Sequence, residues 1–372
     1  MAYKNLRIQQ VELYKLIIPL KEPFVISLGP VENAESVIVL VKTNAGITGF
    51  GECSPYTSIN GESIDTCFIV GQYFAKVLKD KNPLQIKECI AAMDQVIYGN
   101  ASIKSAFDMA LYDIASQHAG VPLYKFLGGK KNKPLTTDMT VSIGDPAKMA
   151  RDALRFKEDG FPAIKVKLGG SKKKDIERIA GIRKAIGKKI PLRIDANQGW
   201  SVNTAIETLI ALGKYGIQHC EEPIARWNFM KLRKVKKNSP IPIMADETCG
   251  DHHDAKRLID LDACDMINVK LGKSGGLFNA KKIIALAEKA GMHMQVGAFM
   301  ESRLGITAGA HLALCSDYII HCDFDTPLMF TEDPVSGGVI YGKNGQVTVP
   351  DTPGLGASID MARLNKMTRV SI

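Results

Sequence analysis

The chain of 372 residues is 45% hydrophobic and 23% charged, with a formal net charge of +9 at pH 7, which is the composition of an ordinary globular protein. No apolar run reaches the ~18 residues of a membrane span, and the opening residues lack the apolar block and cleavage site of a secretory signal, so we expect a cytoplasmic protein without a membrane partner. The lysines are spread over helix-like segments without interleaved aromatic residues, so we expect no nucleic-acid partner either.

Residues 1–125 have the texture of a separate α+β unit. An apolar stretch at 11–18 predicts a strand, and the Pro-rich segment 19–35 predicts a loop. Residues 36–52 predict a β-hairpin with Asn44, Ala45 and Gly46 at the turn. Helical periodicity follows in three segments, near 62–80, 84–98 and 102–119. Strands followed by helices predict an α+β domain that caps the rest of the chain.

From residue 126 to 344 short apolar strands alternate with amphipathic helices. Eight strands are predicted, at 136–142, 163–168, 191–197, 217–223, 241–247, 266–271, 293–299 and 319–325, with a helical pattern in each of the seven gaps. Regular alternation of this kind predicts an α/β fold, a modified (β/α)8 barrel of the TIM type. A normal eighth helix is missing after the last strand. We expect the Gly- and Pro-rich tail, with residues 345–372, to return to the capping domain.

The eight cysteines form no CxxC pair, and several of them lie inside apolar runs. Buried free thiols of this kind are typical of a reducing compartment. We therefore assign none of the cysteines to catalysis.

Polar residues gather at the carboxyl ends of the predicted strands, which is the rim where barrels of this class form their sites. A single acid in such a place often caps the next helix, whereas acids on three successive strands, with lysines on the strands before and after them, are harder to explain by capping. The residues are Lys165 and Lys167, Asp195 and Asn197, Glu221 and Glu222, Asp246 and Glu247, Lys270, Glu301, and Asp323 and Asp325.

The three acidic strand ends predict a metal site. Clustered carboxylates repel one another unless a cation lies between them, and hard oxygen ligands suit Mg²⁺ or Mn²⁺. The residues alone do not choose between Glu221 and Glu222, or between Asp246 and Glu247.

Lysines on the second and sixth strands stand on opposite sides of an eight-stranded barrel. A lysine near a cation and other amines can lose its proton near pH 7 and act as a base. With a substrate carboxylate on the metal, one lysine removes the α-proton, an enediolate forms, and the proton returns from the other face. The predicted reaction is racemisation or epimerisation.

The chain closely resembles the enolase superfamily, in particular its muconate lactonizing enzyme subgroup. The motifs "IKVKLG", "RIDANQGW", "CEEP", "MADET" and "INVKLGKSGG" occur in the family's order, and the likeness spans essentially the whole chain. The resemblance implies that Asp195, Glu221 and Asp246 bind one Mg²⁺ ion, for which Mn²⁺ can substitute. It also implies that Lys167 and Lys270 are the acid/base pair and that Lys165 lies beside the metal-bound carboxylate. Asn197, Glu247 and Glu301 are expected to support these groups.

Within the subgroup, the segment "CDFDTP" is similar to the Asp-x-Asp feature of dipeptide epimerases such as L-Ala-D/L-Glu epimerase, which holds the substrate's α-ammonium group. The resemblance therefore predicts that Asp323 and Asp325 bind an ammonium group and that the substrate is an L,L-dipeptide inverted at its C-terminal residue. Thr140 and Gly297, on the first and seventh predicted strands, are further candidates for substrate contact.

Segment 24–35 corresponds to the loop that closes over the substrate in this family, and it contains no Arg or Lys. An arginine is expected there in L-Ala-D/L-Glu epimerases, whereas the aligned position is Gly29. The apolar neighbours Phe24, Ile26 and Leu28 favour a hydrophobic second residue, although packing within the loop would also account for them.

Several alternatives remain open at this point. Within the superfamily they are an L-Ala-D/L-Glu epimerase, a cationic-dipeptide epimerase, and a cycloisomerase, o-succinylbenzoate synthase or N-acylamino-acid racemase. The last three bind substrates without a free ammonium group, which would leave Asp323 and Asp325 unexplained. A non-catalytic binding protein would leave the lysines and acids unexplained. We expect the protein to form a homo-oligomer.

Overall fold

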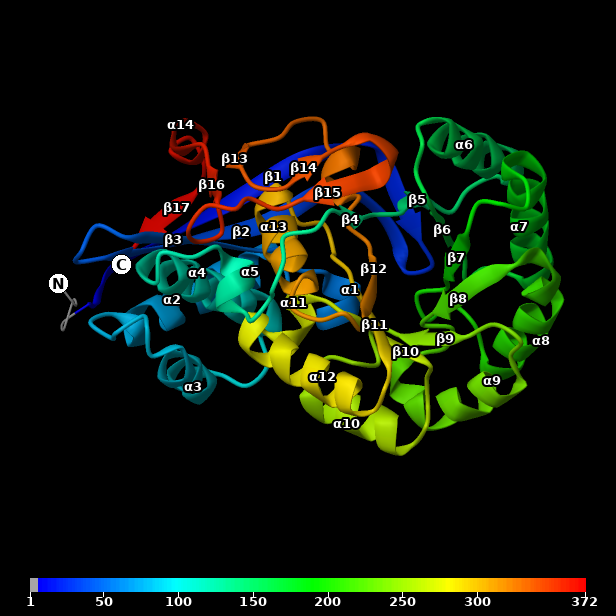
Figure 1. Cartoon of the computed structure of the whole chain (residues 1–372), viewed down its shortest axis with the longest axis horizontal. Helices are drawn as coiled ribbons and strands as arrows, with labels where there is room; N and C mark the ends of the chain where they lie inside the picture. Colours follow the sequence, from blue (N-terminus) through cyan, green and yellow to red (C-terminus); the bar gives the residue numbers. More distant parts are fainter. Residues whose placement is uncertain (1–5) are drawn as a thin grey trace.

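The computed structural model describes residues 6–372. An antiparallel sheet forms the capping region and has the strand order β17-β1-β2-β3. Its members are β1 (Ile8–Ile26), β2 (Gly29–Thr43), β3 (Thr48–Cys53) and the C-terminal strand β17 (Arg369–Ser371). β17 lies beside β1, so the end of the chain returns to the N-terminal sheet (Figure 1).

The prediction of a loop over 19–35 is wrong. β1 and β2 form one long hairpin whose pairing continues to Ile26 opposite Gly29, with an irregular register between Pro19 and Phe24. Proline cannot donate a ladder hydrogen bond and is tolerated at such irregularities. Residues 24–31 therefore form a paired hairpin tip rather than a free loop.

The predicted helices of the capping region are present as α2 (Ile64–Leu78), α3 (Ile86–Val96) and α4 (Ala101–His118), with short helices α1 (Thr57–Asn60) and α5 (Leu123–Phe126) beside them. α4 packs directly on β3. A side-chain carbon at Gly51 would lie 1.9 Å from the carbonyl oxygen of Ala106, so only glycine permits this approach.

Eight parallel strands form the second sheet, in the order β5 to β12 along the chain. A parallel bridge between Thr137 and Cys322 joins its two edges and closes the ring, which confirms the predicted modified (β/α)8 barrel. The strands are β5 (Met139–Val141), β6 (Ile164–Lys167), β7 (Leu192–Asp195), β8 (Ile217–Glu221), β9 (Ile243–Ala245), β10 (Met266–Val269), β11 (His293–Val296) and β12 (Ile319–Cys322).

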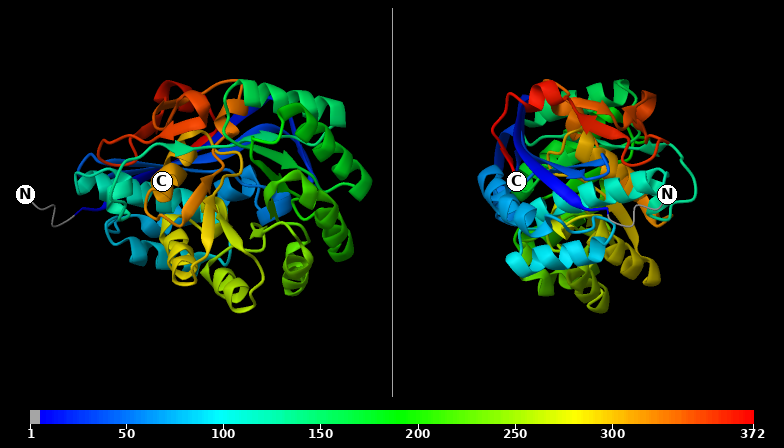
Figure 2. Two further views of the ribbon diagram at one scale, coloured as in Figure 1. Left: turned by 45° about the vertical axis from the view of Figure 1, so that its right-hand side comes forward. Right: turned by 90° about the vertical axis from the view of Figure 1, so that its left-hand side faces the viewer.

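A helix follows each of the first seven barrel strands and covers the outside of the ring (Figure 2). The helices are α6 (Pro146–Glu158), α7 (Lys172–Ile186), α8 (Val202–Leu212), α9 (Leu232–Asn238), α10 (His252–Asp260), α11 (Leu271–Ser274) with α12 (Leu277–Lys289), and α13 (Arg303–Ala313). Capping residues begin several of them. Ser201, for example, accepts a hydrogen bond from the backbone N–H of Thr204 at 3.2 Å.

After β12 a short 3₁₀ turn, η3 (Thr326–Met329), replaces an eighth barrel helix in the described chain. The tail then forms β13 (Val335–Gly337), β14 (Ile340–Tyr341), η4 (Lys343–Gly345), β15 (Gln346–Thr348), β16 (Ala357–Ile359) and α14 (Met361–Leu364) before β17. β15 pairs with β4 (Leu135–Thr136), the short strand that precedes the first barrel strand, so the tail also contacts the start of the barrel.

All eight cysteines are free thiols, and seven of them are buried, as predicted. Among residues 6–372, none of the helices combines the length and apolar character that would let it cross a bilayer.

His311 on the barrel helix α13 contacts the C-terminal tail. Because its side chain is buried, we expect the stability of the fold to fall in acid. Its Nδ1 accepts from the backbone N–H of Tyr124 at 3.1 Å, and its Nε2 lies 3.1 Å from the carbonyl oxygen of Leu355, so the ring is held neutral. Burial lowers the pKa of His311 to about 4 from its ordinary 6.5. The unfolded chain therefore binds more protons between these pH values, and the contribution of His311 to stability, complete above pH 6.5, is lost as the pH falls towards 4.

We expect the free energy of unfolding of the wild type to approach that of a His311→Gln variant as the pH falls from 7 to 4, by about 1.4 kcal/mol for each pH unit below 6.5. Denaturant unfolding of both proteins at several pH values measures this difference. If the difference in unfolding free energy between the two proteins stayed constant from pH 7 to pH 4, His311 would not be the group responsible.

Candidate active site

The lysines and acids at the strand ends meet inside the mouth of the barrel. Asp195 ends β7, Glu221 ends β8, and Asp246 directly follows β9. Each of the three is fully buried, and each brings one carboxylate oxygen within 4.8 Å of the other two. Asp195 and Glu221 are partners in the sheet register of neighbouring parallel strands, and Asp246 follows the next strand. We call these three carboxylates the acidic arc.

Lys165 on β6 spans the interior from the acidic arc to the last strand. Its Nζ lies 2.8 Å from Glu221 Oε2, 3.4 Å from Asp195 Oδ2 and 2.7 Å from Asp323 Oδ2. Burial lowers the pKa of Lys165, but the charges of the carboxylates around it outweigh burial and raise the pKa well above its ordinary value. The two lysines of the apolar strand therefore face inward, where carboxylates surround them.

Lys167 and Lys270 flank the acidic arc from its two ends. Lys167 Nζ lies 2.6 Å from Asp195 Oδ2, and Lys270 Nζ lies 2.7 Å from Asp246 Oδ2. They come from β6 and from the end of β10, with three strands between them in the sheet. The sequence prediction that the two amines stand on opposite sides of the ring agrees with this strand order.

An aromatic ring lies against each of these two amines. The Phe24 ring centre is 5.8 Å from Lys167 Nζ, and the Phe299 ring centre is 5.1 Å from Lys270 Nζ. Phe24 belongs to the hairpin tip and Phe299 to the loop after β11, so the capping region and the barrel each contribute one wall. Tyr56 extends the second wall, with its ring centre 6.1 Å from that of Phe299.

The acids of the arc are held in different states. Burial raises the pKa of Asp246, but the charges of Lys270 and Lys273 outweigh burial and hold the pKa well below its usual range. Burial and the charge of Asp195 raise the pKa of Glu221 to about 7. Lysine ammonium groups contact all three carboxylates in this structure. The oxygens of the three carboxylates also fit a hard divalent cation.

The structure separates Glu221 from its neighbour Glu222. Glu221 points into the barrel, whereas Glu222 has a positive φ of 36° and its side chain accepts the backbone N–H of Asp246 at 2.7 Å. Thr248 also donates its hydroxyl and N–H to Glu222. Glu222 therefore positions the turn that carries Asp246 and does not join the three-carboxylate cluster.

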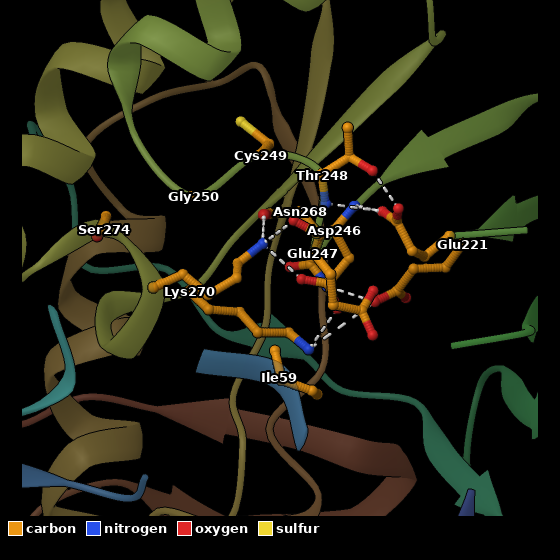
Figure 3. A network of polar contacts seen from close by, with 12 residues as sticks. Ile59, Glu221, Asp246, Glu247, Thr248, Cys249, Gly250, Asn268, Lys270 and Ser274 are labelled. Carbon is orange, nitrogen blue, oxygen red and sulfur yellow. Dashed lines mark hydrogen bonds and ion pairs between the residues drawn. The ribbon is translucent and has the colours of Figure 1, made fainter. Parts of the chain in front are cut away.

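Three residues that the sequence prediction did not single out complete the arc. Asn268 on β10 donates to Glu221 Oε1 at 2.8 Å, and Gln295 on β11 donates to Glu221 Oε2 at 3.4 Å. Lys273 on α11 donates to Asp246 and, at 3.0 Å, to the carbonyl oxygen of Asn268. Figure 3 shows Asn268, Lys270, Asp246 and Glu221 converging on one point. Lys273 stands three residues after Lys270 in the motif "INVKLGKSGG", a spacing that places both on one side of the turn.

The structure also gathers the expected supporting residues. Asn197 donates its backbone N–H to Asp195 Oδ1 at 2.9 Å and its side-chain amide to Glu247 Oε1 at 3.1 Å. Burial and the charge of Asp246 raise the pKa of Glu247 well above its ordinary value. Glu301 accepts the backbone N–H of Phe299 at 2.6 Å and so fixes the loop beside Lys270. Burial raises the pKa of Glu301 to about 7.

The carboxylates of Asp323 and Asp325 lie close together, as the Asp-x-Asp spacing predicts. Asp325 Oδ2 accepts the backbone N–H of Thr140 at 2.7 Å, so Thr140 contributes through its backbone. Gly297 lies behind Lys270: a side-chain carbon there would stand 3.1 Å from the Cε atom of Lys270 and 2.7 Å from Asn268 Oδ1. Gly297 therefore provides room for the lysine.

Hydrogen bonds hold the hairpin tip against the mouth of the barrel. The Ser27 hydroxyl donates to the carbonyl oxygen of Asn197 at 2.6 Å, and the backbone N–H of Ile143 donates to the carbonyl oxygen of Val25 at 2.9 Å. Ile26 is buried, whereas Leu28 is 37% exposed. Gly29 has a φ of 124° and open space where a side chain would stand. Of the three apolar tip residues, Phe24 is the one beside a site lysine.

Two family models match the chain. The N-terminal domain of mandelate racemase / muconate lactonizing enzyme matches residues 9–128, and the enolase C-terminal domain-like model matches residues 148–363. The chain belongs to the enolase superfamily. This confirms the family predicted from the strand-end motifs.

Named members of this superfamily are similar to the chain over nearly its full length. D-Ala-D/L-Ala epimerase of Cytophaga hutchinsonii is 57% identical over 98% of this chain and 99% of its own. L-Ala-D/L-Glu epimerase of Clostridium acetobutylicum is 39% identical over 94% of this chain and 98% of its own. The crystal structure of a dipeptide epimerase from Cytophaga hutchinsonii, complexed with Mg and D-Ala-L-Val, has a TM-score of 0.98 to this structure at 57% identity and covers 98% of this chain and 100% of that one.

Proposed function

We propose that this protein is a Mg²⁺-dependent dipeptide epimerase, an isomerase that inverts the α-carbon of the C-terminal residue. The observation that carries the proposal is the placement of Lys167 and Lys270 at the two ends of one carboxylate arc. A substrate carbon above this arc has an amine on each face, which is what inversion by proton removal and return requires. The full-length similarity to a D-Ala-D/L-Ala epimerase supports the same reaction.

Asp195, Glu221 and Asp246 would hold the Mg²⁺ ion. The donor set fits, because three buried carboxylates from three successive strands offer only oxygen ligands within 4.8 Å of one another. When bound, the ion supplies positive charge that stabilises a substrate carboxylate as its α-carbon becomes more acidic. The dipeptide epimerase with which this chain shares 57% identity binds Mg together with a dipeptide.

The side chains around the metal site would have separate roles in the reaction. One of Lys167 and Lys270 removes the α-proton, and the other delivers a proton to the opposite face, so that configuration is inverted. Lys165 lies between Glu221 and Asp323 and holds positive charge beside the developing enediolate. Phe24 and Phe299 cover the two amines and exclude water from them.

The α-ammonium group of the dipeptide would bind at Asp323 and Asp325. Asp323 directly follows the last barrel strand, β12, and Asp325 directly precedes η3. Both lie across the ring from Glu221, and Lys165 contacts Glu221 and Asp323. A dipeptide with its carboxylate at the acidic arc places its ammonium end towards this pair. Substrates without a free amine leave the pair unused, which disfavours the cycloisomerase, o-succinylbenzoate synthase and N-acylamino-acid racemase alternatives.

We further propose that the second residue of the substrate is apolar. The walls around the lysines are formed by Phe24, Phe299 and Tyr56, and the glycine at position 29 offers no charge to an acidic side chain. D-Ala-L-Val, bound by the structure described above, has such a second residue. Because the relative at 57% identity is named for D-Ala at the first position, we rank D-Ala-first dipeptides above the L,L-dipeptides predicted from the sequence.

Deuterium exchange tests this function directly. The protein with Mg²⁺ in D₂O is expected to replace the C-terminal α-proton of D-Ala-L-Val and D-Ala-L-Ala and to produce the inverted epimer, followed by nuclear magnetic resonance. L-Ala-L-Val should react more slowly, and dipeptides ending in Glu or Lys more slowly still. Exchange of an N-acylamino acid without exchange of any dipeptide would refute the proposal, and fast reaction of a dipeptide ending in Glu or Lys would refute the apolar preference.

We place the enzyme in the cytoplasm, where its eight free cysteines stay reduced, and we propose that it works as a homo-oligomer. Size-exclusion chromatography with light scattering tests the latter. A monomeric mass of the active enzyme would refute it.

A further inference from the structure

A third acid lies beside the Asp-x-Asp pair. Asp138, which precedes β5, brings a carboxylate oxygen within 4.8 Å of oxygens of both Asp323 and Asp325. All three side chains are buried, and Asp138 is 1% exposed. The bridge between Thr137 and Cys322 closes the barrel at this point, and closure is what brings the first and last strands together.

One oxygen of Asp138 has no partner. Arg193 on β7 donates to Asp138 Oδ2 at 2.8 Å, whereas Oδ1 is buried and accepts no hydrogen bond from the described residues. A buried acceptor without a donor is unfavourable. This oxygen is therefore available to a donor from outside the chain.

The cluster is also short of positive charge. Arg193 pairs with Asp138, and Lys165 pairs with Asp323 at 2.7 Å but is shared with Glu221 and Asp195. Asp325 has the neutral N–H of Thr140 and no ion pair within the part of the chain that the structure describes. Burial and the charges of Asp323 and Asp138 raise the pKa of Asp325 well above its ordinary value, so a cation bound here would stabilise the charged form of this carboxylate.

The geometry fits an ammonium ion. Three oxygens separated by up to 4.8 Å can all lie about 2.8 Å from one central point, which is the usual N⁺–H···O⁻ distance. A primary ammonium group carries three N–H donors, one for each carboxylate.

We propose that Asp138 is the third acceptor of the substrate's α-ammonium group and that it makes the site selective for a primary amine. The inference rests on the proposed function and adds a specificity-determining residue to it. Asp138 is held in place for this role, because Arg193 also donates to Gln218 Oε1 at 3.1 Å and its Nη2 lies 2.8 Å from His321 Nδ1.

The test compares D-Ala-L-Val with its N-methyl derivative, which has two N–H donors instead of three. Asp138→Asn keeps the shape and an oxygen for Arg193 but replaces the free acceptor by an NH₂ group. We expect wild-type protein with saturating Mg²⁺ to bind the N-methyl dipeptide at least 10-fold more weakly than the parent, as measured by calorimetry. The Asp138→Asn variant should bind the parent dipeptide at least 10-fold more weakly than the wild type does and should bind the N-methyl dipeptide nearly as well as the wild type does. The ratio of the two dissociation constants should therefore fall to about one.

Asp152→Asn provides the matched control, because Asp152 pairs with Lys148 at 2.8 Å on the surface of α6 and should leave both affinities unchanged. Unaltered discrimination in Asp138→Asn would show that Asp138 is structural. Loss of one bound divalent ion per chain in that variant would show that the cluster is a metal site. Both results overturn the proposal.

Wild-type protein alone also decides the question if the variant does not fold. Equal affinity for the parent and N-methyl dipeptides would overturn the three-acceptor site. Failure of the proposed function is distinct, because it would appear as an absence of α-proton exchange in every dipeptide with the wild type.

Discussion

Replacing either lysine of the pair is expected to abolish epimerisation while leaving one half of the chemistry intact. Lys167→Ala and Lys270→Ala should each lower the rate of epimer formation by at least ~10³-fold, because a positioned acid or base contributes up to about 10⁴-fold. The amines come from β6 and from the end of β10, so in the proposed mechanism each would face one side of the substrate carbon. The remaining lysine can still remove and return a proton on its own side.

The two variants should therefore label opposite epimers. In D₂O, one variant should exchange the α-proton of the L epimer without inverting it, and the other should do the same with the D epimer. Lys172→Ala serves as the control, because Lys172 is a surface residue that pairs with Glu207 at 2.8 Å. Undiminished inversion in Lys167→Ala or Lys270→Ala would refute the two-lysine mechanism, and labelling of the same epimer by both would place the amines on one face.

Removing the metal, or one of its proposed ligands, should have an effect of similar size. Glu221 is central to the arc, since Lys165, Asn268 and Gln295 all contact its carboxylate. Glu221→Gln removes one of three charged ligands, and we expect turnover to fall by at least ~10³-fold, or roughly 4 kcal/mol of transition-state stabilisation. Dialysis of the wild type against a chelator should abolish activity, and Mg²⁺ or Mn²⁺ should restore it.

Thermal unfolding separates metal loss from a damaged fold. An ion that binds only the folded protein stabilises it by about 2.7 kcal/mol at a concentration 100 times its Kd. Mg²⁺ should therefore raise the Tm of the wild type and of the surface control Glu207→Gln but not that of Glu221→Gln. Full turnover in the presence of chelator, or an unchanged response of Glu221→Gln to Mg²⁺, would contradict the assignment of the three acids.

Much of the fold can be predicted from local patterns in the sequence. The strand-to-helix alternation follows from side-chain periodicity along short segments, and each of the eight predicted barrel strands is present. Residues at the carboxyl ends of parallel strands share one rim in any such barrel, so the lysines and acids could be brought together without coordinates. The extension of the hairpin through residues 19–35 could not be predicted, because the prolines and charges of this segment are typical of a loop and are accommodated here by an irregular register between β1 and β2.

Local patterns in the chain are sufficient to predict the architecture and the residue types at the rim: lysines at both ends and carboxylates between them. Which carboxylates lie together depends on the tertiary fold. Glu222 turns away through a positive φ, Lys273 reaches Asp246 from the following helix, and Asp138 meets Asp323 and Asp325 where the first and last strands close the ring. These relations depend on how the backbone turns at strand ends and on contacts between segments up to 187 residues apart, such as Phe324 with Thr137, for which neighbouring residues carry no signal.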